Sequence, residues 1–340
     1  TASSPDFHLP LAIMPPPYAI SLPTASFPLA RRPDSPHCFF IMKKLITCLA
    51  VLLLPGCIEF EKQTLVFRHY PETDTLVIWQ HYEGIYGEDQ EHGLSEKERD
   101  QLHSVVNGQR TFFFANWMTE YNAKDIDRVI KEGEAELQNG IEPKAEADAA
   151  RQLLALAKLL KKSVAIKNGP FYLNEQKRLS ATQQITIRNA GKIIRKLNSA
   201  LRASILREDA PFGVFEEGDP NIELLEKSAH AKMEYLTLQG QQLRFQCPLT
   251  KKNFREIDVN EMKIFRKAGV TFEHKDNLIT VTMGKVKAEQ TAVSIPLQKV
   301  AFQPNATEAV SKRYGLAEDF DPVQARAKFL KDSDARYLKK

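Results

Sequence analysis

Two runs rich in β-branched and aromatic residues decide the fold: Thr64-Leu-Val-Phe-Arg-His-Tyr70 and Thr75-Leu-Val-Ile-Trp-Gln-His-Tyr82. Between them lies Pro71-Glu-Thr-Asp74, a segment of turn-forming residues. Two strand-forming runs separated by so short a polar segment are typical of a β-hairpin. We therefore expect an antiparallel hairpin near the start of the folded chain.

The segments after the hairpin combine helical and extended patterns. Ser95-Glu-Lys-Glu98 has the spacing of a capping box, in which an acid follows the cap residue by three positions. We expect helices over 95–107, 143–162, 184–207, 221–232, 259–268, 307–314 and 322–338, and strands over 164–173, 235–238, 242–247, 270–273, 278–283 and 292–297. The sequence thus predicts an α+β protein, with an N-terminal β-hairpin followed by helices and then a second mixed α/β segment with short strands.

Two local patterns make more detailed predictions. Phe113, Trp117 and Tyr121 recur at helical spacing within the aromatic cluster of residues 111–121, so we expect a helix with an aromatic, core-facing side. Asn168-Gly-Pro170 predicts a turn that interrupts the strand over 164–173.

The segment 209–220 contains two prolines and two glycines and predicts an irregular connection. We place a domain boundary there, which divides the chain into α+β domains over 57–210 and 211–340. Residues 1–41 hold nine of the nineteen prolines and precede Met42. They are interpreted either as an over-extended reading frame or as a disordered Pro-rich extension.

A basic start and an apolar run precede the hairpin. Met42-Lys-Lys44 is followed by ten mostly apolar residues, 45–54, the last of which opens Leu54-Pro-Gly-Cys57. This pattern resembles the signal peptide and lipobox of bacterial lipoprotein precursors, over residues 42–57 only. A transmembrane anchor or a short buried helix are the alternatives, although a spanning helix needs about 20 apolar residues.

The resemblance implies processing and an anchor. Cys57 would carry the lipid, and Gly56 would be the last residue removed with the signal peptide over 42–56. Ile58, where this class often has Asp for inner-membrane retention, favours the outer membrane, facing the periplasm. Cys247 is then the one thiol left without lipid, so we expect no internal disulfide.

Charge is strongly segregated along the chain, although the formal net charge is only +4. Residues 83–148 hold sixteen Asp and Glu against seven Lys and Arg, and residues 151–207 hold thirteen Lys and Arg against one acid. Within the second block, one amphipathic segment without acids carries six basic residues: Arg188, Lys192, Arg195, Lys196, Arg202 and Arg207.

This basic segment is the candidate binding site for a membrane with anionic lipid or for an acidic envelope partner. The alternative is a solvated face, or one that pairs with the neighbouring acidic blocks. No aromatic platform is interleaved with the basic positions, so we expect no nucleic-acid partner.

No motif for zinc, nucleotide or acyl-transfer chemistry is present, and we expect no cofactor and no metal. Cys247 with His230 or His274 is interpreted as a core thiol rather than a catalytic pair. The hairpin register would place His69 and His81 far apart.

The sequence therefore favours a non-enzymatic binding or scaffolding lipoprotein. The alternative is an envelope hydrolase that uses unidentified carboxylates, among them Glu83, Glu88, Asp89 and Glu91.

Overall fold

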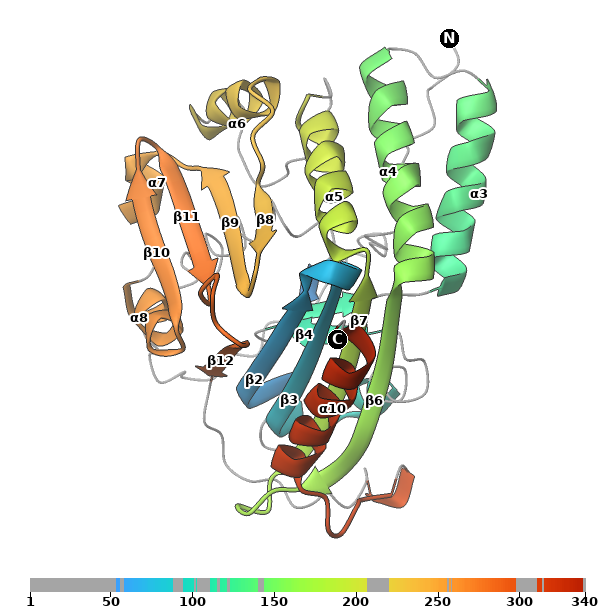
Figure 1. Cartoon of the computed structure of the whole chain (residues 1–340), viewed down its shortest axis with the longest axis vertical. Helices are drawn as coiled ribbons and strands as arrows, with labels where there is room; N and C mark the ends of the chain where they lie inside the picture. The colour runs from blue at the N-terminus through green and yellow to red at the C-terminus, as the bar shows by residue number, and fades with distance from the viewer. Residues whose placement is uncertain are drawn as a thin grey trace, which may run out of the picture.

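The computed structural model combines helices with antiparallel sheets, so the α+β class is confirmed (Figure 1). It describes residues 53–55, 58–87, 94–100, 102, 111–114, 117–120, 123–139, 144–206, 220–255, 257, 259–297, 311–313 and 315–338. Gly56, Cys57 and Arg207 lie outside these ranges.

The longest strands are β2 (Ile58–Tyr70) and β3 (Thr75–Gly87), which pair antiparallel over almost their full length. A one-turn 3-10 helix, η1 (Pro71–Thr73), connects them, with Pro71 in its first position. Asp74 then adopts a left-handed conformation, with φ of 49°, and its N–H donates to the carbonyl of Pro71. The register pairs Tyr70 with Thr75, as a four-residue connection requires.

This hairpin lies inside a five-stranded antiparallel sheet with the order β12-β2-β3-β7-β6. Its other strands are β6 (Val164–Leu173), β7 (Leu179–Arg188) and β12 (Thr291–Pro296). The register of β6 shifts between Asn168 and Phe171. The turn expected at Asn168–Pro170 is therefore wrong, because the chain accommodates these residues as a bulge within a continuous strand.

A second antiparallel sheet has the order β10-β11-β9-β8. Its strands are β8 (Leu236–Gln239), β9 (Gln242–Pro248), β10 (Val270–Lys275) and β11 (Leu278–Met283), and the helices of this part are α6 (Pro220–His230), α7 (Lys251–Arg255) and α8 (Val259–Lys267). Its core includes Leu225, Tyr235 and Ile279, all at most 2% exposed.

Three helices stand side by side at one end of the five-stranded sheet: α3 (Ala123–Asn139), α4 (Lys144–Ser163) and α5 (Ala190–Ile205) (Figure 1). Ion pairs from α4 hold α3, among them Lys158 with Glu134 at 2.6 Å. Helix α5 belongs to two cores, because Ile193 packs with α4 whereas Leu201 packs with the second sheet.

Two side-chain amides link α5 to the second sheet and the second sheet to the five-stranded sheet. Each amide bonds to the backbone of one strand residue as a neighbouring strand would. Asn198 of α5 exchanges two hydrogen bonds with the backbone of Leu236 on β8, at 2.7 and 2.9 Å. Gln241, in the turn between β8 and β9, does the same with His69 of β2, at 2.7 Å each. These two amides satisfy backbone groups that strand pairing leaves open at the sheet edges.

The C-terminal helix α10 (Pro322–Tyr337) lies across one face of the five-stranded sheet (Figure 1). Arg68 of β2, whose side chain is 9% exposed, donates to Asp334 of α10 at 2.6 Å. The Tyr70 hydroxyl donates to the same carboxylate at 2.7 Å, while Trp79 packs near Phe329. Burial tends to lower the pKa of Arg68, but the hydrogen bond and charge of Asp334 outweigh it and raise that pKa.

Several elements differ from the sequence predictions. Residues 184–188 belong to β7, because alternating Thr, Ile and Gln side chains fit the pairing with β3. The aromatic cluster forms two strands, β4 (Thr111–Phe114) and β5 (Trp117–Glu120), instead of a helix. Together with β1 (Leu53–Pro55) they make a third sheet, in the order β1-β5-β4.

The capping box at Ser95 is confirmed, because the Ser95 N–H donates to Glu98 at 2.6 Å and the Glu98 N–H donates to the Ser95 hydroxyl at 3.3 Å. The expected division near residue 210 does not separate the sheets. Both β12 and α10 come after it, yet they pack on the hairpin of β2 and β3.

Replacing Asp334 with Ala should destabilise the fold by about 2 kcal/mol, because the buried guanidinium of Arg68 loses its main partner. Urea unfolding would measure the loss. Asp332→Ala is the matched control, since Asp332 is an exposed carboxylate on the same helix and should change stability by less than about 0.5 kcal/mol. Equal stability of both variants would contradict a stabilising role for the Arg68–Asp334 pair.

Candidate functional site

The six predicted basic residues do not form one helical face. Arg188 is the last residue of β7, and Arg207 lies outside the described residues. Lys192 and Arg195 are exposed on the first turns of α5, with Lys196 half-buried beside them. Arg202 is used structurally, because it donates to the carbonyl of Met233 at 2.9 Å.

The hairpin turn positions the start of α5. Asp74 accepts a hydrogen bond from the Gly191 N–H at 2.7 Å, and its own carbonyl accepts one from Ala190 at 2.9 Å. A carboxylate at this end complements the helix dipole. The loop between β2 and β3 therefore fixes where Lys192 and Arg195 are presented.

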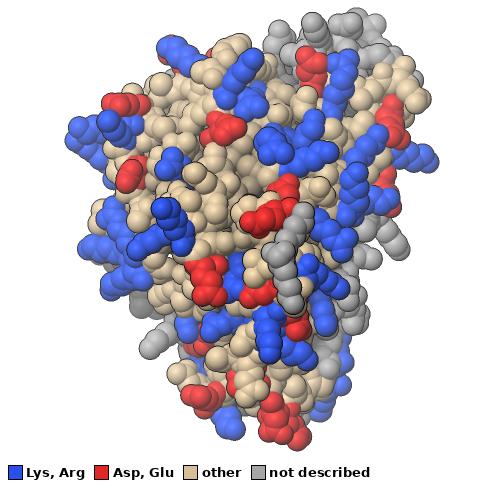
Figure 2. All heavy atoms as spheres, viewed as in Figure 1, with Lys and Arg blue, Asp and Glu red and all other residues tan. Residues whose placement is uncertain are grey.

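The cations at this end of the molecule are available for binding. Among the described residues, none forms an ion pair with Arg188, Lys192, Arg195 or Lys196. Figure 2 shows Lys and Arg over α4 and α5 and beside α10, with acids interspersed. This face of the molecule therefore carries separate basic patches and is not uniformly basic.

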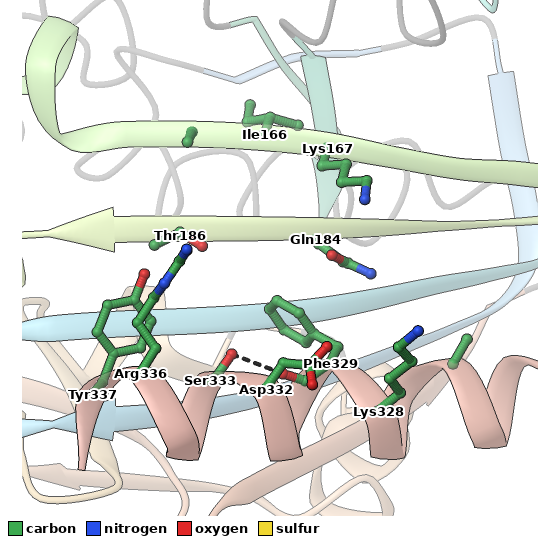
Figure 3. A pocket seen from close by; sticks show the side chains of 12 residues that line it. Ile166, Lys167, Gln184, Thr186, Lys328, Phe329, Asp332, Ser333, Arg336 and Tyr337 are labelled. Atoms are coloured by element: carbon green, nitrogen blue, oxygen red, sulfur yellow. Dashed lines mark hydrogen bonds between the residues drawn. The ribbon is translucent and has the colours of Figure 1, made fainter.

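A groove of about 690 Å³ runs between α10 and the strands β6 and β7 (Figure 3). Its sheet side includes Lys167, Gln184 and Thr186, and its helix side includes Lys328 and Arg336. Both lysines and Arg336 are exposed. The groove gives no signal in the sequence, because its two walls are about 150 residues apart in the chain and neither wall carries a recognisable motif.

A cluster of titratable groups lies on the same sheet. The Nε2 atom of His81 is hydrogen-bonded to the Tyr172 hydroxyl, and its Nδ1 atom is 3.5 Å from Glu83, which also pairs with Lys62 at 2.8 Å. Hydroxyl, imidazole and carboxylate occur in the order of a nucleophilic triad. However, Tyr172 is only 3% exposed, and burial together with the charge of Glu83 raises its pKa. The cluster is therefore structural: a hydrogen bond links β3 to β6, and the ion pair of Glu83 with Lys62 links β3 to β2.

The other residues considered for chemistry have structural contacts. Cys247 is 2% exposed in the core of the second sheet, and His274 is hydrogen-bonded to the Leu249 carbonyl at 2.8 Å while stacking on Phe254. Glu88, Asp89 and Glu91 lie outside the described residues. In the part of the chain that the structure describes, no three His, Cys, Asp or Glu side chains are grouped to hold a metal.

Comparisons with known proteins give no relative. No family model matches the chain, and no curated protein or solved structure matches it. None of the helices in the described ranges has the length and apolar character needed to span a membrane.

The pKa of His81 is lowered, chiefly by burial, with Glu83 opposing the shift. The unfolded chain then binds this proton more readily than the folded chain. Stability from His81 is complete above its unfolded pKa of about 6.5 and should fall as the pH decreases below that value. Unfolding by urea from pH 8 to pH 5 should show a smaller loss for His81→Asn than for the unchanged chain. His230→Asn, an exposed position, is the control, and equal slopes in all three proteins would contradict the assignment.

Proposed function

We propose that this chain is a lipid-anchored protein of the bacterial envelope with a binding or scaffolding role. Cys57 would hold it at the outer membrane, facing the periplasm. The observation that carries the proposal is the basic start and apolar run that close on Leu54-Pro-Gly-Cys57. One acyl chain anchors only marginally, so the two or three chains of this protein class make attachment lasting.

Processing at Gly56 would remove β1, which is formed by Leu53–Pro55. Strand β1 pairs with one edge of β5, so its loss would leave the β4–β5 hairpin intact. The two larger sheets use no residue before Ile58. A chain that begins at Cys57 therefore retains every strand of both large sheets.

The unpaired cations around the start of α5 support binding to an acidic partner. Each basic residue near an anionic surface contributes about 1 kcal/mol, so three adjacent cations bias orientation strongly for a tethered protein. Of the four carboxylates considered for hydrolysis, Glu83 lies within the described residues. Its ion pair with Lys62 and its contact with His81 give it a structural role. The binding role therefore has the stronger support.

Cells that express the chain from Met42 should incorporate radiolabelled palmitate and retain the protein in the membrane pellet. Cys57→Ser should abolish both, because the lipid-bearing thiol is missing. Cys247→Ser, at a buried thiol, is the matched control and should keep the label. A soluble and unlabelled unchanged protein would contradict the anchor.

Reversing Lys192, Arg195 and Lys196 to Glu should weaken binding of the purified protein to vesicles that contain anionic lipid, or to its acidic partner, by more than about tenfold. Circular dichroism should show an unchanged fold, since these side chains have no ion-pair partner among the described residues. The control reverses Lys251, Lys252 and Arg255 of α7, which gives the same change in net charge on another helix. Unchanged binding by the α5 variant to both kinds of partner would remove this surface from consideration.

A further inference from the structure

We propose that the groove between α10 and β6–β7 binds a saccharide that carries a phosphate at each end. The proposal does not depend on the lipid anchor or on the α5 surface. The groove has a volume of about 690 Å³, which is in the range of small-molecule binding sites.

Two lysines define one end of the groove. Lys167 of β6 is paired across the strands with Gln184 of β7, and Lys328 reaches toward them from α10 (Figure 3). Among the described residues neither lysine has an ion-pair partner. Two ammonium groups beside an amide can neutralise and hydrogen-bond a single phosphate.

Arg336 defines the other end. Its guanidinium lies beside Thr186 of β7 (Figure 3), and it too lacks an ion-pair partner within the described ranges. Arg188 follows Thr186 by two residues on the same strand and so lies on the same face of the sheet. A planar guanidinium is suited to bidentate binding of phosphate.

The two cationic ends are separated along α10. Lys328 and Arg336 are eight residues apart, which corresponds to about 12 Å of helix. This separation of the two backbone positions exceeds the size of one phosphate, so the two ends suit two phosphates at opposite ends of a disaccharide.

The middle of the groove disfavours a continuous polyanion. Asp332 is an exposed carboxylate there, positioned between the two ends, and it would repel further negative charge (Figure 3). A carboxylate instead accepts hydrogen bonds from hydroxyl groups. Phe329, also between the two ends on α10, adds an apolar surface against which a sugar ring can pack. A hydroxyl-bearing ring between two phosphates matches this order of groups.

Isothermal titration calorimetry on the full chain would test the proposal with four probes. These are a disaccharide with one phosphate on each ring, its monophosphate, inorganic phosphate and linear pentaphosphate. The bisphosphate should bind at least about tenfold more tightly than the monophosphate, because it makes charge-assisted hydrogen bonds at both ends. Pentaphosphate should bind more weakly than the bisphosphate. No binding of the bisphosphate, or equal binding of bisphosphate and inorganic phosphate, would overturn the proposal.

Variants distinguish the groove from general charge attraction. Lys328→Glu and Arg336→Glu should each weaken bisphosphate binding by about fivefold or more, with unchanged circular dichroism. Lys331→Glu, an exposed cation of α10 that does not line the groove, should bind normally. Asp332→Asn should raise the affinity for pentaphosphate relative to the bisphosphate. Equal losses in the Lys328, Arg336 and Lys331 variants would overturn the assignment to the groove.

Discussion

The structure depends on satisfying the backbone hydrogen bonds of β2. Nine of the thirteen residues of β2 are buried, so open N–H and C=O groups along this strand would be costly. One edge pairs with β3 immediately after the turn, but the other is completed by β12 and, at His69, by the amide of Gln241. This second edge brings Gln241, 172 positions from His69, and β12, more than 220 positions from its partners on β2, against the hairpin. The hairpin therefore determines the arrangement of both large sheets.

The same strand also determines the position of the C-terminal helix. Arg68 brings a charge into a poorly solvated face, and this charge requires a partner. Asp334 supplies it, together with a hydrogen bond from Tyr70, and thereby places α10 against the sheet. The groove with Lys167 and Arg336 exists because α10 is held in this position. The ion pair between Arg68 and Asp334 thus places α10 so that the cations of the helix and of the sheet line one groove.

Elements that depend on nearby residues were predicted correctly from the sequence. Reciprocal capping by Ser95 and Glu98, the strands β8 to β12 and helix α10 all followed from spacing and propensity. The residues 184–188 were misassigned to a helix because their apolar positions continue the periodicity of α5. Pairing with β3 outweighed this pattern, and Asn189, with φ of 55°, separates the strand from the helix. Arg188 consequently belongs to the sheet, beside the groove.

By itself the sequence determined the α+β class, most element positions, the segregation of charge and the resemblance of residues 42–57 to a lipoprotein signal. Each of these can be read from the order of residues along the chain, without knowing which distant segments meet. Only the tertiary structure decided that β12 joins β2, that α10 covers the hairpin, and that Lys167 and Arg336 border one groove. The reason is physical: such contacts join residues more than a hundred positions apart. Apolar periodicity marks which face of an element is buried, but it does not indicate which distant element covers that face or pairs with its edge.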